Sequence, residues 1–269
     1  MERSYLFIPG HNEKLIGKAF TAGADAVMFD LEDSVPEPDK DLARTRVAAA
    51  LEAAPDDAPA WVRINAPRTE TAARDLGAVA GRVRGIRIPK VESPGDVDWV
   101  RRRAPGVALI CAIESARGLL AAQEIATAPN VRNLSIGGVD LRKDLHTDGH
   151  PLALLHARSH LVICSRAAGI EPPIDSVYAR LDDDAGLRTE SEFARSLGFF
   201  GKSAIHPKQL PAIHAAFTPS SDEVAWARAV LDAFEQAGRG ALRMPDGEFV
   251  DLPVARRAER VLAMSGTAR

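Results

Sequence analysis

The chain has 269 residues, of which 46% are hydrophobic, and a formal net charge of −3. It is long enough to bury a sizeable core, and its nearly balanced charge does not indicate a protein that binds nucleic acid or a membrane surface. No apolar stretch is long enough to span a membrane and the first residues lack the layout of a signal peptide, so we expect a cytoplasmic protein.

Short apolar runs alternate with helical patterns from the start of the chain. Runs of this length are typical of strands that are buried on both faces of a parallel sheet. The run at 171–174 has the weakest pattern, because Pro172 and Pro173 interrupt it. The predicted strands are residues 5–8, 26–29, 61–64, 85–88, 108–113, 134–136, 171–174 and 201–205.

Helical patterns occupy the segments between these runs. Strands that alternate with helices in this way predict an α/β fold, and eight strands over this length predict a (β/α)8 TIM barrel. We assign the barrel to residues 1–239. The predicted helices are residues 12–22, 40–54, 116–126, 152–168 and 221–238.

The last segment, residues 240–269, has a different pattern. A hairpin is predicted around the turn Asp246-Gly247, followed by a helix over 253–264. About 30 residues are too few to hold a core of their own. We therefore expect this arm to pack on another surface, in this subunit or in a neighbour.

Two carboxylates follow neighbouring strands at the point where each strand ends. Glu114 follows the fifth strand and Asp140 follows the sixth, and a charge at such an exit must meet a partner, a metal or a ligand. Carboxylate oxygens suit Mg²⁺, and no His or Cys pair at zinc spacing competes. The alternative is that each carboxylate caps the helix after it.

Cys111 and Cys164 lie in apolar stretches and are predicted to be buried free thiols.

Basic residues also follow strands. Arg63, at the end of the third strand, can hold a substrate carboxylate or a developing enolate oxygen. The alternative is an ion pair with the acidic cluster Asp30, Glu32 and Asp33 after the second strand. Lys90 and His206 follow the fourth and eighth strands and are weaker candidates for ligand contacts.

Taken together and in order, the motifs resemble those of the citrate lyase β-subunit-like proteins and of the related malyl-CoA and citramalyl-CoA lyases, within the HpcH/HpaI aldolase family. The likeness runs nearly from end to end of the chain. One departure lies at the second carboxylate, where Val139 stands in place of the family's usual glutamate. The matching motifs are Arg3-Ser4-x-Leu6-Phe7-Ile8-Pro9-Gly10, Asp30-Leu31-Glu32-Asp33-Ser34, Val62-Arg63-Ile64-Asn65, Pro89-Lys90-Val91-Glu92, Ile113-Glu114-Ser115-Ala116-x-Gly118 and Ile205-His206-Pro207-x-Gln209.

The resemblance implies a Mg²⁺-dependent lyase that cleaves or forms a carbon–carbon bond in a 3-hydroxy-carboxylic acyl-CoA thioester, with a 2-oxo acid as the other substrate. It implies that Glu114 and Asp140 hold Mg²⁺ and that Arg63 binds substrate and stabilises the enolate. The tail motif Gly247-Glu248-Phe249-Val250-Asp251 resembles a lid, whose Asp251 is an acid/base in the family's trimers or dimers of trimers. Two alternatives are a citrate lyase β subunit acting on an acyl-carrier-protein thioester and a non-catalytic ligand-binding homologue.

Overall fold

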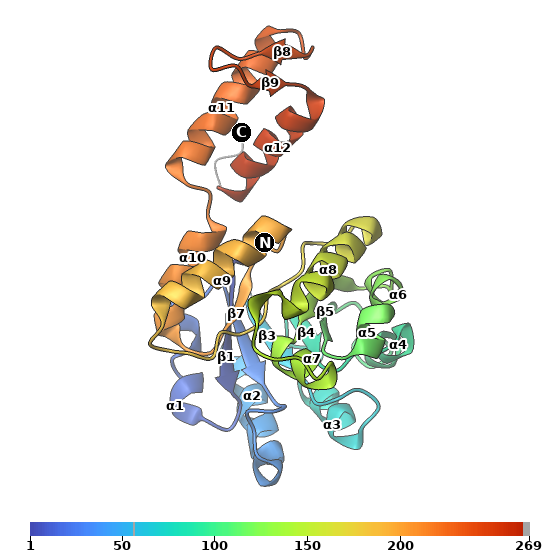
Figure 1. The fold of residues 1–269 in the computed structure, drawn as a ribbon. Helices are drawn as coiled ribbons and strands as arrows, with labels where there is room; N and C mark the ends of the chain where they lie inside the picture. The colour runs from blue at the N-terminus through green and yellow to red at the C-terminus, as the bar shows by residue number, and fades with distance from the viewer. Residues whose placement is uncertain (56, 266–269) are drawn as a thin grey trace. The chain divides into compact units, whose positions relative to one another are not determined.

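The computed structural model describes residues 1–55 and 57–265 and divides the chain into two compact units, Met1–Ile213 and His214–Arg269. The first unit is an α/β fold built on one sheet of seven parallel strands, in the order β6-β5-β4-β3-β2-β1-β7 (Figure 1). The strands are β1 (Ser4–Pro9), β2 (Ala26–Asp30), β3 (Ala60–Arg63), β4 (Gly85–Ile88), β5 (Ala108–Ile113), β6 (Val131–Ile136) and β7 (Lys202–Ala204).

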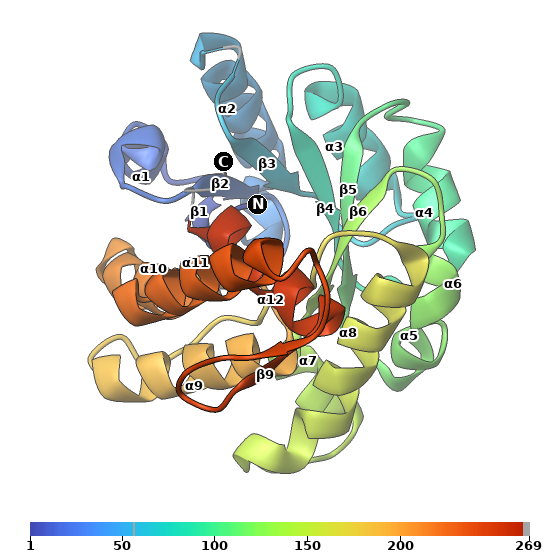
Figure 2. The same ribbon diagram turned by 90° about the horizontal axis from the view of Figure 1, so that it is seen from above.

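Helices surround the outside of this sheet, as the view in Figure 2 shows for α2, α3, α4, α6 and α8. Two predicted helices are shorter than expected. The pattern over 116–126 is two helices that meet at Ala121, and the pattern over 12–22 is a short helix and a 3-10 turn. The helices are α1 (Glu13–Ile16), α2 (Lys40–Ala53), α3 (Glu70–Val79), α4 (Pro94–Arg101), α5 (Ala116–Leu120), α6 (Ala122–Ala126), α7 (Gly138–Asp144), α8 (Leu155–Ala168), α9 (Asp184–Leu197) and α10 (Leu210–Phe217).

The inner face of the sheet carries an apolar core. Buried side chains of β1, β2, β3 and β5 form one cluster, in which the rings of Tyr5 and Trp61 meet edge to face with centroids 6.2 Å apart. Side chains alternate between the two faces of a strand, so the inward residues beyond this cluster are those at the carboxyl ends of the strands. Asp30 and Arg63, which the sequence singled out, are among them.

The predicted strand at 171–174 is wrong, because only single bridges form there. Ser135 of β6 bridges to Ile174, and Asp175 bridges to Lys202 of β7. Proline has no amide hydrogen to donate to a strand ladder, so Pro172 and Pro173 prevent a longer pairing. The eight strands expected for the barrel are therefore seven strands and a two-residue segment that contacts both edges of the sheet.

A buried charge network holds this two-residue segment. Nζ of Lys202, whose side chain is fully buried, lies 2.6 Å from Asp175 Oδ2 and 2.6 Å from Glu190 Oε1. Arg158 of α8 contacts the other oxygen of Asp175 at 3.1 Å. Charged hydrogen bonds thus join the segment to β7, α8 and α9 where strand pairing is short.

The second unit has a core of its own. Its elements are α11 (Ser221–Gln236), the antiparallel pair β8 (Leu242–Arg243) and β9 (Phe249–Val250), and α12 (Leu252–Met264). Val230 and Phe234 of α11 pack with Val250 and Ala258, and Trp226 Nε1 donates to Glu248 Oε2 at 2.7 Å. The predicted hairpin and helix are present, and they pack on α11, which the sequence analysis had grouped with the barrel. In the described part of the chain, no helix has the length and apolar character needed to cross a membrane.

Candidate active site

Three charged residues lie side by side across three strands of the first unit. Asp30 at the end of β2 is the register partner of Arg63 on β3, and Arg63 is the register partner of Arg87 on β4. Partners in a parallel pair point to the same face, so the three side chains form a row on the inner face of the sheet. All three line one cavity of about 490 Å³, together with Glu114 and Asp140.

Arg63 is held by the acidic cluster. Its Nε and Nη2 donate to the two oxygens of Asp30, both at 2.7 Å, and its Nη1 lies 2.9 Å from Glu32 Oε2. Burial alone would lower the pKa of Arg63, but the hydrogen bonds and charge of Asp30 outweigh it and raise that pKa. The ion pair between Arg63 and the acidic cluster, which the sequence offered as an alternative to a substrate contact, is therefore formed. A guanidinium has more N–H donors than these contacts use, so donors remain for an oxygen in the cavity.

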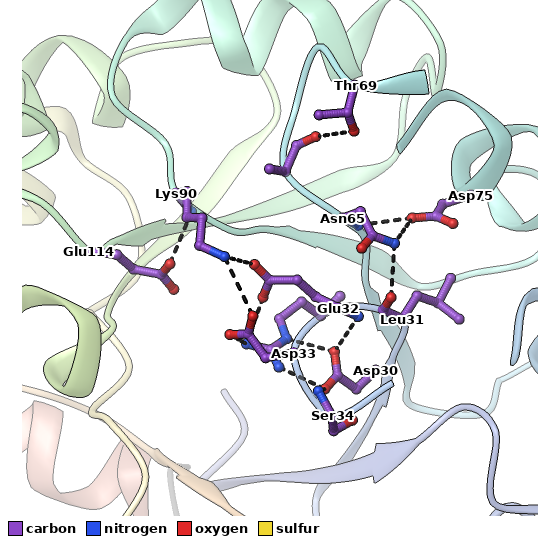
Figure 3. Close-up of polar contacts among 12 residues, drawn as sticks. Asp30, Leu31, Glu32, Asp33, Ser34, Asn65, Thr69, Asp75, Lys90 and Glu114 are labelled. Atoms are coloured by element: carbon purple, nitrogen blue, oxygen red, sulfur yellow. Dashed lines mark hydrogen bonds and ion pairs between the residues drawn. The ribbon is translucent and has the colours of Figure 1, made fainter. Parts of the chain in front are cut away.

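Lys90 connects the acidic cluster to Glu114. Its Nζ contacts Glu32, and its backbone N–H donates to Glu114 Oε2 at 3.2 Å (Figure 3). The backbone of Lys90 has a φ of 51°, a left-handed conformation that is uncommon for a residue with a side chain. Such local strain concentrates at functional sites. Lys90 thus contacts two carboxylates, of which Glu114 lines the cavity.

Glu114 is a buried carboxylate that occupies the space left by the missing side chain of Gly137. Only 6% of its surface is exposed, and burial raises its pKa to about 7, against the opposing charge of Arg87. A Cβ on Gly137 would lie 2.3 Å from Glu114 Cγ, so glycine at this position leaves space for the glutamate side chain. Asp140 is half-buried in the first turn of α7 and lines the same cavity.

Glu114 and Asp140 suit Mg²⁺ better than they suit a metal that is held by protein ligands alone. Among residues 1–55 and 57–265, no group of three or more His, Cys, Asp or Glu side chains is arranged to hold a metal ion. Mg²⁺ in proteins commonly takes one or two carboxylates and completes its octahedron with waters and substrate oxygens. Glu114 and Asp140, facing one cavity, supply such a set.

Arg87 is a cavity residue that the sequence analysis missed. It lies within a four-residue strand, Gly85-Ile86-Arg87-Ile88, where an apolar residue is expected. The guanidinium is 5.4 Å from the ring centroid of Phe7, which also lies under Arg63 at 5.0 Å. A charge in the middle of a short buried strand is the signal that could have identified it.

Two other candidate residues make helix-capping hydrogen bonds. His206 caps a 3-10 turn, with its Nδ1 accepting from Lys208 N at 3.1 Å. Asp251, in the second unit, caps α12, with Oδ1 accepting from Val254 N at 3.2 Å. Cys111 and Cys164 are both buried and free, so that prediction is confirmed.

Comparisons with known proteins identify relatives of this chain. The model of the family HpcH/HpaI aldolase/citrate lyase matches residues 3–207. The citrate lyase subunit beta of Escherichia coli is 38% identical over 97% of this chain and 92% of its own. The (3S)-malyl-CoA thioesterase of Cereibacter sphaeroides is 39% identical over 93% of this chain and 89% of its own.

A solved structure extends the likeness to almost the whole chain. The protein CitE of Mycobacterium tuberculosis, in complex with magnesium, acetoacetate and coenzyme A, has a TM-score of 0.85 and 35% identity, covering 98% of this chain and 97% of that one. Its bound magnesium supports the predicted Mg²⁺ cofactor. The predicted family and the lyase class are confirmed, and the chain belongs to the HpcH/HpaI aldolase/citrate lyase family.

Proposed function

We propose that the protein is a Mg²⁺-dependent lyase that cleaves, or in reverse forms, a 3-hydroxy-carboxylic acyl-CoA thioester, giving a 2-oxo acid and an acyl-CoA. The observation that carries the proposal is the convergence of Glu114, Asp140 and Arg63 on one cavity at the carboxyl ends of parallel strands. The relative crystallised with magnesium, acetoacetate and coenzyme A supports this substrate class. We also propose that the sheet closes as a (β/α)8 barrel through the bridges at Ile174 and Asp175.

Each side chain has a distinct task in the cleavage. Glu114 and Asp140 would hold Mg²⁺, which when bound supplies positive charge beside the oxygens of the forming 2-oxo acid. Arg63 is fixed by Asp30 and lines the cavity, so its remaining N–H donors would be available to a substrate oxygen there. As the bond between C2 and C3 breaks, its electron pair forms the acyl-CoA enolate, the C3–O bond becomes the carbonyl of the 2-oxo acid, and the hydroxyl proton passes to water in the open cavity.

Asp251 would complete the reaction as the acid that protonates the enolate carbon. In the condensation direction the same carboxylate would remove a proton from the acyl-CoA methyl group. The second unit would then act as a lid, and the resemblance to trimeric lyases supports a lid that serves a neighbouring subunit in a homotrimer or a dimer of trimers. The helix cap at Val254 engages one oxygen of Asp251 and leaves its other oxygen for this role.

The metal site is tested by Asp140→Asn. A panel of 3-hydroxyacyl-CoA thioesters is assayed with and without Mg²⁺, and the variant is expected to lose at least about 10²-fold in turnover, since even groups that only support metal ligands matter by up to this factor. Asp148→Asn, an exposed aspartate outside the cavity, is the control and should behave as the wild type. Activity that is independent of Mg²⁺ would reject the proposal.

The shared lid is tested by mixing two inactive variants. Asp251→Ala lacks the acid and Arg63→Ala lacks the cavity arginine, so exchanged oligomers contain some sites with both residues intact. Partial recovery of activity is expected. Subunit exchange without recovery would contradict a lid supplied by a neighbour.

A second candidate is thioester hydrolysis, favoured by the 39% identity to a (3S)-malyl-CoA thioesterase. Product analysis separates the two, because a hydrolase releases the hydroxy acid and free coenzyme A and forms no 2-oxo acid. Use of an acyl-carrier-protein thioester, as in a citrate lyase complex, is distinguished by comparing the two thioesters directly.

A further inference from the structure

Arg87 is a buried cation with unused hydrogen-bond donors. Only 4% of its surface is exposed, yet Nε and Nη1 have no hydrogen-bond partner within the described residues. Nor does any ion pair reach its guanidinium in residues 1–55 and 57–265. Buried polar groups in native proteins are nearly always paired with protein, water or a ligand.

The carboxylates near Arg87 are engaged elsewhere. Both oxygens of Asp30 accept from Arg63. Glu32 contacts Lys90 and Arg63, and Glu114 accepts from the backbone of Lys90. Glu114 is the carboxylate whose charge acts most on Arg87, but within the described residues no hydrogen bond or ion pair joins the two side chains.

This unpaired buried charge destabilises the ligand-free protein. Burial lowers the pKa of Arg87 to about 10, so the group is still positively charged at neutral pH. Its register neighbour Arg63 is also positive, and the ring of Phe7 offsets only part of the lost hydration. A ligand that accepts hydrogen bonds from the unused donors of Arg87 would remove this cost.

We propose that Arg87 binds a second carboxylate of the substrate, one that is not held at the metal, and that the 2-oxo acid half of the substrate is therefore dicarboxylic. This rests on the proposed lyase function. The planar guanidinium matches a carboxylate with two parallel hydrogen bonds, and Arg87 faces the same cavity as Arg63, Glu114 and Asp140. The hydroxyl of Ser203 lines that cavity and also lacks a hydrogen-bond partner among the described residues, so it is a second donor for the same group.

The inference is tested by binding in the presence of Mg²⁺. Titration calorimetry compares fresh oxaloacetate, with two carboxylates, and pyruvate, with one, for the wild type, Arg87→Met and Arg87→Lys. The wild type should prefer oxaloacetate at least about 10-fold, and Arg87→Met should weaken oxaloacetate by about 10- to 100-fold and pyruvate much less, as expected for a lost charged hydrogen bond. Arg87→Lys should fall between, because it keeps the charge and loses the fork.

Thermal unfolding without ligand separates binding from structure. Removal of an unpaired buried charge should leave the melting temperature of Arg87→Met unchanged or raise it. Arg68→Met removes an exposed arginine outside the cavity and is the control for the loss of charge. A variant that fails to fold or melts lower would assign Arg87 to the fold and overturn the inference.

The outcomes distinguish this inference from the proposed function. If the wild type binds neither acid when Mg²⁺ is present, the lyase proposal fails. If it binds both and Arg87→Met keeps the same ratio of affinities, Arg87 holds only water or a small anion, and the second-carboxylate inference alone fails.

Discussion

Two groups of buried charges in the first unit differ in how they are paired. Around Lys202, each charge meets an opposite one, with Asp175 held between Lys202 and Arg158. In the cavity, Nε and Nη1 of Arg87 have no hydrogen-bond partner among the described residues, and Glu114 accepts only a backbone N–H there. Fully paired buried charges hold elements of the fold together, whereas charges left open indicate where a ligand binds. Each prediction below tests one side of this comparison.

The largest effect is expected for Lys202→Met, which should lower stability by breaking the paired network around Asp175. The change leaves Asp175 with one cationic partner in a fully buried position, which typically destabilises a protein by about 3–5 kcal/mol. Urea unfolding measures the loss. Lys208→Met is the control, because its exposed Nζ lies 3.9 Å from an exposed Asp182 and should contribute less than about 0.5 kcal/mol. Equal effects of the two variants would contradict a structural network.

The loss of stability caused by Lys202→Met should depend on pH. Burial would raise the pKa of Asp175, but Lys202 and Arg158 outweigh it and lower that pKa below the ordinary 3.8. A carboxylate with a lowered pKa stabilises the fold above its unfolded-state pKa, and this stabilisation is lost as pH falls through the folded-state value. The difference in stability between wild type and Lys202→Met should therefore be greatest near neutral pH and shrink below pH 3.8. A difference that grows on acidification would be the wrong sign.

Arg63 lines the cavity but, unlike Arg87, it is paired with a carboxylate, Asp30. Arg63→Lys should reduce turnover by about 10²-fold, since an ammonium cannot hold Asp30 with two bonds and also present a fixed donor to the substrate. Arg44→Lys is a matched control, because Arg44 has a similar exposure and a buried carboxylate partner, Asp75, outside the cavity. Near-normal turnover with a lower melting temperature would make Arg63 a structural residue.

Much of this architecture could be predicted from the sequence. Apolar runs closed by Pro, Gly or a charge located seven strands, and the charges at their ends correctly pointed to one end of the sheet. The segment at 171–174 was predicted as a strand despite Pro172 and Pro173, and the two missing amides leave only the bridges at Ile174 and Asp175. Helix α11 was grouped with the barrel because its apolar face, which packs on α12, has the same periodicity as a barrel helix.

The state of each charge could not be predicted in the same way. The sequence left Arg63 open between an ion pair and a substrate contact, and the structure contains the ion pair while keeping Arg63 at the cavity. Arg87 was overlooked because its importance lies in the partners it lacks. Pairing depends on which carboxylates are already engaged, and this follows only from three-dimensional distances.

The smallest expected effect tests the space around Glu114. Gly137 has an ordinary φ of −92°, so Gly137→Ala introduces no backbone strain, and its effect is the crowding of Glu114 Cγ at 2.3 Å. If Glu114 is a metal ligand, a small displacement should weaken Mg²⁺ binding by about 10-fold, as changes beside metal ligands do. Gly77→Ala, in open space on α3, should leave Mg²⁺ affinity unchanged and raise stability by about 0.5–1 kcal/mol. Calorimetric titration with Mg²⁺ measures both variants, and unchanged Mg²⁺ affinity in Gly137→Ala would mean that Glu114 does not bind the metal.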